Sequence, residues 1–355
     1  PGLVPSAIGV EAEISALRSG VASKYPQIEG IPELRTEASR FLKAFVDTDI
    51  APDHCIPTVG SMQATFAAFT AMSQISEDKD TILYIDPGFS VQKTQAKVIG
   101  VKTTAFDIFN YRADKLEPKL EELLSNGNIA AIIYSNPNNP TWMCLCESEL
   151  EVIGRLAMKY DAVVVEDLAY MAMDFRKDMG RPFEPPYQPS VSKYTDYYII
   201  TMSASKIFSY AGQRIAVMGI SDKLFDRKYP ALDKRYGIPR FGAAMTQAIL
   251  YCLSAGTAHS PQYAIAAMLK AANDGDYNFV EEVSEYGRRT HLMKEIFTRN
   301  GFNIVYDRDM DESLSDGFFF TVGYGGVEGG ELQRLLLQYG GSGRVSSTAG
   351  SHKQG

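Results

Sequence analysis

Short apolar runs and amphipathic stretches alternate along the first two thirds of the chain. The runs are rich in β-branched and aromatic residues, and five of them are expected as strands: residues 81–85, 129–134, 162–166, 197–201 and 215–219. Because they are apolar at consecutive positions, both faces of each strand are expected to be buried, as in a parallel sheet. Between them, stretches such as residues 32–45 have helical spacing of apolar residues. The pattern predicts a three-layer α/β fold, with a mostly parallel sheet between two layers of helices.

The pattern changes after about residue 260. Two helices, two antiparallel strands and a last helix are expected there, in this order: residues 262–273, 278–300, 302–306, 318–322 and 330–339. The chain is long enough for more than one domain, at roughly 150 residues each. We expect an N-terminal arm that joins the small domain, a large domain and a small C-terminal α+β domain, over residues 1–15, 16–270 and 271–355.

Composition excludes several classes of protein. Lys and Arg number 35 against 43 Asp and Glu, and this net charge of −8 argues against nucleic acid or anionic membranes as partners. No apolar run approaches the roughly 18 residues that cross a bilayer, and the N-terminus lacks a signal-peptide pattern. The four cysteines and four histidines form neither a disulfide framework nor a zinc motif. A cytoplasmic protein without a metal centre is expected.

Chemically active side chains follow three of the predicted strands. They lie in residues 135–141, at Asp167 and Tyr170, and in residues 203–206 with Arg214. A glycine-containing turn, residues 58–62, precedes an expected helix. Ligands of α/β sheets bind at the carboxyl ends of the strands, so these groups are expected to converge.

Together these groups indicate one cofactor. The Lys206 amine can form a Schiff base with a carbonyl. An ionised Asp167 can keep a pyridine nitrogen protonated, which makes the ring an electron sink. A helix N-terminus with serine and arginine donors can bind a phosphate. Pyridoxal 5′-phosphate needs all three.

Three segments then carry a family resemblance. Residues 203–214 are similar to a motif S-x-S-K with an arginine eight residues after the lysine. Residues 139–141 resemble the start of N-P-T-G, and residues 167–170 resemble D-x-x-Y. In these motifs and their order the chain resembles the class I/II aminotransferases, which are fold-type I pyridoxal-phosphate enzymes. Trp142 departs from the pattern, because it stands where the family has glycine; the turn is expected either to avoid positive φ or to present this tryptophan at the site entrance.

The resemblance implies a role for each matched residue. Lys206 would hold the cofactor and move protons, and Asp167 would pair with the pyridinium nitrogen. Asn139 and Tyr170 would hydrogen-bond the ring hydroxyl, and Phe89 would stack on the ring face. The phosphate would be bound by the N–H groups of Ser61 and Met62 and by the side chains of Ser203, Ser205 and Arg214. Tyr25 resembles a tyrosine that reaches the neighbouring subunit's phosphate, which implies a homodimer with shared active sites.

The implied activity is transfer of an amino group between an amino acid and a 2-oxo acid. Two alternatives stay open at this point. A carbon–sulfur β-lyase or a decarboxylase would use the same residues, and a non-catalytic ligand sensor would use the same fold. The family's arginine for the substrate carboxylate follows a segment that resembles residues 346–355. The chain ends before it, so the small domain is expected to be truncated.

Overall fold

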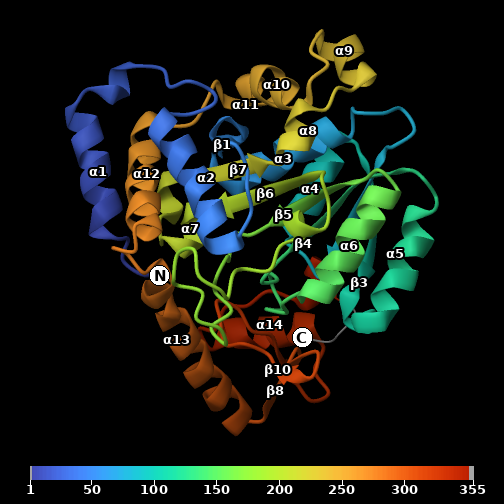
Figure 1. Cartoon of the computed structure of the whole chain (residues 1–355). Helices are drawn as coiled ribbons and strands as arrows, with labels where there is room; N and C mark the ends of the chain where they lie inside the picture. The colour runs from blue at the N-terminus through green and yellow to red at the C-terminus, as the bar shows by residue number, and fades with distance from the viewer. Residues whose placement is uncertain (1, 352–355) are drawn as a thin grey trace.

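A seven-stranded sheet runs through the middle of the molecule, whose computed structural model describes residues 2–351 (Figure 1). The strand order is β1-β7-β6-β5-β4-β2-β3. Strands β2 to β6 are mutually parallel, whereas β7 is antiparallel to both β6 and β1. The bounds are β1 (Cys55–Thr58), β2 (Thr81–Asp86), β3 (Lys102–Asp107), β4 (Ile129–Ser135), β5 (Val163–Asp167), β6 (Tyr198–Ser203) and β7 (Ala216–Ile220). The predicted mostly parallel sheet is confirmed.

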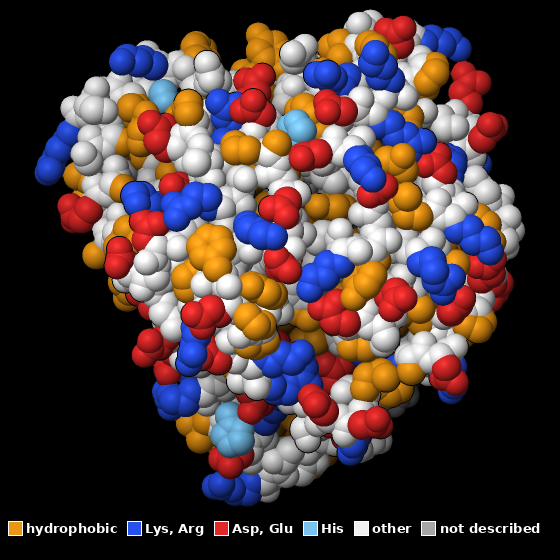
Figure 2. Space-filling view, in the orientation of Figure 1, with side chains coloured by type: hydrophobic (Ala, Val, Ile, Leu, Met, Phe, Trp, Pro, Cys, Tyr) orange, Lys and Arg blue, Asp and Glu red, His pale blue; other side chains and the backbone are white. Residues whose placement is uncertain are grey.

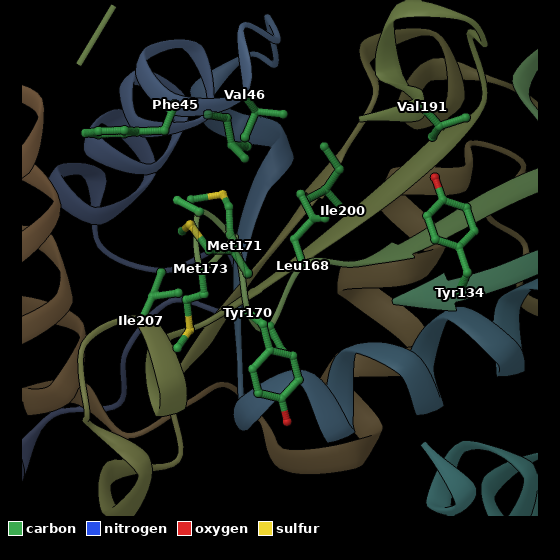
Figure 3. Close-up of a cluster of buried hydrophobic side chains, with 14 of the residues drawn as sticks. Phe45, Val46, Tyr134, Leu168, Tyr170, Met171, Met173, Val191, Ile200 and Ile207 are labelled. Atoms are coloured by element: carbon green, nitrogen blue, oxygen red, sulfur yellow. The ribbon is translucent and has the colours of Figure 1, made fainter. Parts of the chain in front are cut away.

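Helices cover both faces of this sheet, which explains why its strands are apolar at consecutive positions. Alternate residues of β5 enter different cores: Val164 packs in one, and Val163 and Val165 pack in the other. The first core also contains residues from α2 (Pro32–Val46), α5 (Leu116–Leu124), α6 (Glu147–Lys159) and α12 (His259–Asn273). The second contains residues from α3 (Gly60–Met72), α4 (Ser90–Ile99), α8 (Asp222–Asp226), α9 (Pro230–Tyr236), α10 (Phe241–Ala243) and the π-helical segment Ala244–Leu250. Figure 3 shows part of the first core, with Leu168, Met171 and Met173 packed together after β5.

Two strands of the sheet were not expected from the sequence, and both lie at its edges. Strand β1 is four residues long and contains Pro57, which an edge strand tolerates because one side needs no backbone donor. Strand β3 begins with exposed polar residues, so it has no continuous apolar run. Strand β3 is therefore exposed where it begins, whereas β1 is buried throughout but is too short and too polar in sequence to form a distinct apolar run.

The C-terminal part forms the lower end of the molecule in Figure 1. Its elements are α13 (Phe279–Arg299), β8 (Phe302–Ile304), β9 (Arg308–Asp309), β10 (Glu312–Ser313), β11 (Val322–Tyr324) and α14 (Gly329–Gln338). Strands β8 and β11 are antiparallel, as expected. The prediction of a strand over residues 318–322 is wrong for its first four residues, because β11 starts only at Val322. The rings of Phe318 and Phe319 instead contact Tyr170 of the preceding part of the chain.

The N-terminal segment forms helix α1 (Ala7–Arg18), which packs along α12, and α12 packs along α2 (Figure 1). Helix α12 continues through residue 270 to Asn273, so the expected domain boundary falls inside a helix. The division into a large and a small domain stays a prediction. Residues 352–355 of the expected small domain lie outside the described residues.

The remaining helical elements are short. They are α7 (Ala204–Ile207), α11 (Tyr251–Ser254) and the 3-10 turns Val21–Ser23, Pro52–His54, Ile108–Asn110, Ala113–Lys115, Val191–Lys193, Ala211–Gln213 and Ser346–Ala349. Within residues 2–351, no helix is both long enough and apolar enough to cross a bilayer. Acidic and basic side chains are interspersed over the face shown in Figure 2.

Candidate active site

A cavity of about 670 Å³, here called the Lys206 cavity, lies at the carboxyl ends of β4, β5 and β6. These neighbouring parallel strands end at one edge of the sheet, so the residues at their ends converge. Ten of the eleven predicted site residues line this cavity: Ser61, Met62, Phe89, Asn139, Asp167, Tyr170, Ser203, Ser205, Lys206 and Arg214.

Asp167 is the last residue of β5 and its carboxylate is buried. Oδ2 accepts a hydrogen bond of 2.9 Å from Gln92 Nε2, and Oδ1 accepts bonds from Thr201 Oγ1 at 3.1 Å and from the Ala169 N–H at 3.2 Å. Burial raises the pKa of Asp167 to about 6, although the three hydrogen bonds oppose the rise. All three partners are neutral, so a cation in the cavity would lower this pKa by favouring the carboxylate.

Lys206 lies on the short helix α7, which follows β6 directly. Burial and, to a smaller extent, the Arg214 guanidinium lower the pKa of the Lys206 amine. Its Nζ lies 4.4 Å from the centre of the Phe318 ring. A lowered pKa makes more of the neutral amine available, and the neutral form is the nucleophile that attacks a carbonyl.

Tyr170 and Asn139 form a polar pair in the same cavity lining. Asn139 Nδ2 donates a hydrogen bond of 3.2 Å to the Tyr170 hydroxyl. Burial raises the pKa of Tyr170 far above its ordinary value, so the phenol keeps its proton. In Figure 3 the Tyr170 hydroxyl is directed away from Met171 and Met173. The phenol accepts from Asn139, and its own proton can be donated to an acceptor in the cavity.

The N-terminus of α3 and the Arg214 side chain form a cationic cradle at one end of the cavity. No side chain caps α3, so its first N–H groups are available to an anion. Gly60 has φ +67°, and a Cβ there would lie 2.5 Å from Arg214 Nη2. Arg214 Nη1 donates to Ser205 Oγ at 3.3 Å and to the Ala211 carbonyl at 2.9 Å. A helix N-terminus beside a guanidinium favours a phosphate.

These groups fit pyridoxal 5′-phosphate. The amine of Lys206, the buried carboxylate of Asp167 and the cationic cradle line one cavity. The cofactor has an aldehyde, a basic ring nitrogen and a phosphate, which match these three groups in turn. Asn139 and Tyr170 lie in the same lining and can reach the ring hydroxyl from there.

Tyr25 is the predicted site residue that the structure places elsewhere. It is 93% exposed and lines a separate surface hollow with Arg35, Arg240 and Tyr251. Its expected function concerns the phosphate of a neighbouring subunit, and that function stays a prediction.

Both expectations for Trp142 are wrong. Its φ is +67°, so the turn keeps a positive φ without glycine. The indole is fully buried and is not part of the cavity lining. It fits beside Gly317, where a Cβ would lie 1.8 Å from its ring, and it packs against Tyr170 with ring centres 5.4 Å apart. Trp142 therefore packs against Tyr170 from outside the cavity lining.

Several residues at the cavity were not singled out from the sequence. They are Gln92 and Thr201 beside Asp167, the three phenylalanines at positions 318–320, and Arg344. Thr201 had a usable signal, because it lies in β6, next to β5, and is the register partner of Asp167. Gln92 reaches Asp167, and residues 318–320 reach the cavity, only through contacts between segments far apart in the chain.

Comparison with known proteins identifies the family. The sequence profile described as aminotransferase class I and II matches residues 3–313. The chain belongs to this family. Class I and II aminotransferases depend on pyridoxal phosphate, in agreement with the groups that line the Lys206 cavity.

Individual class I and II relatives are distant in sequence. The chain is 25% identical over 210 residues to an asparagine–oxo-acid transaminase of Streptococcus mutans, covering 58% of this chain and 50% of the relative. It is 27% identical over 217 residues to an aspartate aminotransferase of Thermotoga maritima, covering 61% and 54%. The chain spans about half the length of the curated relatives it matches.

Solved aminotransferase structures have the same fold. A Thermus thermophilus aspartate aminotransferase mutant matches with a TM-score of 0.76 and 20% identity, over 99% of this chain and 87% of that one. An alanine aminotransferase from Pyrococcus furiosus matches with a TM-score of 0.77 and 19% identity, over 98% and 81%. At these identities the likeness shows the fold alone.

Proposed function

We propose that this protein is a pyridoxal-phosphate-dependent aminotransferase that moves an amino group between an amino acid and a 2-oxo acid. One observation carries the proposal: the Lys206 amine, the Asp167 carboxylate and the cradle of α3 and Arg214 line one cavity. Family membership supports the same activity, and the relatives named above are transaminases.

Each cavity residue has a definite task in this reaction. The bound cofactor would supply a carbonyl that condenses with amines and a ring that withdraws electrons from the substrate Cα. Asp167, once ionised, holds a proton on the ring nitrogen. Arg214, Ser205 and the α3 N-terminus hold the phosphate and fix the orientation of the ring. Lys206 Nζ takes the proton from the substrate Cα, and its lowered pKa suits that task.

The second candidate activities are carbon–sulfur β-elimination and decarboxylation. They need the same lysine and aspartate, because an electron sink stabilises any carbanion at Cα. The transaminase names of the curated relatives favour amino-group transfer over both.

The proposal includes a homodimer and a cytoplasmic location. The exposed position of Tyr25 is compatible with a contact to a second subunit's phosphate. All four cysteines are free, which is compatible with a reducing compartment.

The experiment uses the purified protein loaded with pyridoxal phosphate. Borohydride reduction followed by peptide mapping should find the cofactor fixed on Lys206, and Lys206→Ala should block this labelling. Each amino acid is then mixed with the loaded protein, and the products are analysed. A 2-oxo acid together with the amine form of the cofactor supports transamination, whereas release of ammonia with pyruvate, or of carbon dioxide, supports the second candidates. Labelling at another lysine would refute the assigned site.

A further inference from the structure

Three consecutive phenylalanines line the Lys206 cavity. Residues 318–320 precede β11, so they are not held in a strand. In a strand, neighbouring side chains point to opposite faces, and only every second one can line the same cavity. The irregular backbone before β11 allows Phe318, Phe319 and Phe320 to line it together.

The rings nearest the amine form a continuous surface. Phe318 lies over Lys206 Nζ, and its ring centre is 5.0 Å from that of Phe319. Both rings contact Tyr170, at 5.6 and 5.5 Å between centres. Two leucines of α14, Leu332 and Leu336, belong to the same lining. We call Phe318, Phe319, Leu332 and Leu336 the apolar wall.

The position of the apolar wall determines what it contacts. A substrate amino group must reach the position of Lys206 Nζ, so the substrate Cα and its side chain lie next to Phe318. A carboxylate or amide placed against the apolar wall would lose water without gaining a hydrogen bond from these four side chains. An aromatic or large aliphatic side chain would instead gain from leaving water.

Other charged residues of the cavity do not offer a buried site for an acidic side chain. Asp167, Lys206 and Arg214 have tasks at the proposed cofactor. Arg344 is the remaining charged residue among those that line the cavity in the described part of the chain, and it is exposed. The apolar wall is more enclosed, since Leu332 is buried and the other three members are half-buried.

We infer that the substrates are amino acids with aromatic or large aliphatic side chains, held against the apolar wall. This inference rests on the proposed aminotransferase function. It sets the chain apart from the relatives named for aspartate and asparagine. Discrimination by an apolar pocket typically reaches 10- to 200-fold, so phenylalanine or leucine should exceed aspartate by roughly 100-fold in kcat/KM of the half-reaction.

The first test measures binding alone and requires no reaction of the bound compound. Binding of 3-phenylpropanoate and of succinate to the cofactor-loaded protein is compared by calorimetry. The two acids have the same three-carbon carboxylate and differ in a terminal phenyl or carboxylate group. The phenyl compound should bind at least tenfold more tightly. Tighter binding of succinate would overturn the inference.

The second test uses amino-acid half-reactions and a matched pair of variants. Leu336→Asn places an amide in the apolar wall and should reduce kcat/KM for phenylalanine about tenfold or more. Leu337→Asn changes the next residue of α14, which is 58% exposed and outside the cavity lining, and should leave that value unchanged. Equal effects of the two variants on kcat/KM for phenylalanine would contradict substrate binding at the apolar wall.

The two proposals fail in different ways. If no amino acid converts the cofactor to its amine form, the aminotransferase proposal fails. If aspartate converts it faster than phenylalanine and leucine, and Arg344→Gln abolishes this reaction, the aminotransferase proposal stands and the apolar substrate class is wrong.

Discussion

The side-chain amide of Gln92 donates a hydrogen bond of 2.9 Å to the carboxylate of Asp167. The donor lies on α4, and the acceptor ends β5, 75 residues later in the chain. Both side chains are buried. A hydrogen bond to an ionised group favours the ionised form, so Gln92 favours the carboxylate that the proposed function requires at Asp167.

Replacing Gln92 by leucine should therefore weaken cofactor binding. Leucine has a similar volume and no donor, so the pKa of Asp167 rises further above about 6. Hydrogen bonds to charged groups contribute roughly 1.5–3 kcal/mol, which corresponds to a tenfold or greater loss of affinity for pyridoxal phosphate. A titration followed by absorbance measures this loss. Thr94→Leu, at an exposed position of the same helix, is the control and should bind normally.

Asp167→Asn should stabilise the protein prepared without cofactor, in a pH-dependent way. The pKa of Asp167 is about 6 in the folded protein and 3.8 ordinarily, so ionisation in the fold is penalised above about pH 6. Below about pH 3 the carboxyl is protonated in both states and the penalty is absent. The variant should gain up to about 3 kcal/mol in free energy of unfolding at pH 8.

The same Asp167→Asn gain should shrink to nothing as the pH falls to about 3. Asparagine can keep the three neutral contacts, because its oxygen accepts from Thr201 and Ala169, and its amide can donate to a rotated Gln92. Urea denaturation at several pH values gives the comparison. A gain that does not change with pH would contradict the raised pKa. The variant should also bind pyridoxal phosphate more weakly, because it cannot offer a negative charge.

Gly60→Ala tests the cationic cradle. The new methyl group would lie 2.5 Å from Arg214 Nη2, so the guanidinium must move away from the α3 N-terminus. Cofactor affinity should fall at least tenfold. Gly100→Ala is the matched control, because Gly100 also has a positive φ, +82°, but nothing lies within 4 Å of its added Cβ. Both variants should lose about 1 kcal/mol of stability from the backbone strain. Similar cofactor affinities would show that the Arg214 position is unimportant.

Asp309 of β9 is joined to earlier segments of the chain through an ion-pair network. Its carboxylate accepts hydrogen bonds of 2.9 Å from Arg112 and from Arg176, and one of 3.1 Å from the Cys144 N–H. Asp309→Asn removes the anion that these guanidinium groups share, although Arg112 keeps Glu149 and Arg176 keeps Asp174. The loss of these charged hydrogen bonds should cost about 1.5–3 kcal/mol in urea denaturation.

Glu312→Gln is the control for the Asp309 prediction. Glu312 pairs with Arg176 at 3.5 Å, but its side chain is 73% exposed, so the change should cost less than about 0.5 kcal/mol. Equal costs at the two positions would rule out a special role for the buried network.

The sequence predicted the inner strands of the sheet and the site residues that belong to recognisable motifs. Runs such as residues 162–166 are apolar because helices cover both faces of the sheet, and that burial is visible in the amino-acid order. The edge strands were missed for different reasons: β3 begins with exposed polar residues, and β1 is buried but only four residues long. Lys206, Asp167 and Arg214 were recognised because their spacing matches motifs, and they line one cavity.

The features that local sequence patterns could not predict depend on contacts between segments far apart in the chain. Residues 318–320 have the composition of a strand, yet the rings of Phe318 and Phe319 pack against Tyr170, about 150 residues earlier. Trp142 at a positive φ looks unfavourable by itself. Gly317, far along the chain, provides the space that its indole fills. Neither outcome is encoded within ten residues of the position concerned.

The irregular backbone at residues 318–320 has a consequence for how easily such a protein changes its preference. Exchanging one of these rings reshapes the pocket but breaks no pairing between β8 and β11, which starts two residues after Phe320. Substrate selectivity can therefore change through single replacements among these phenylalanines, while the strands around them stay paired.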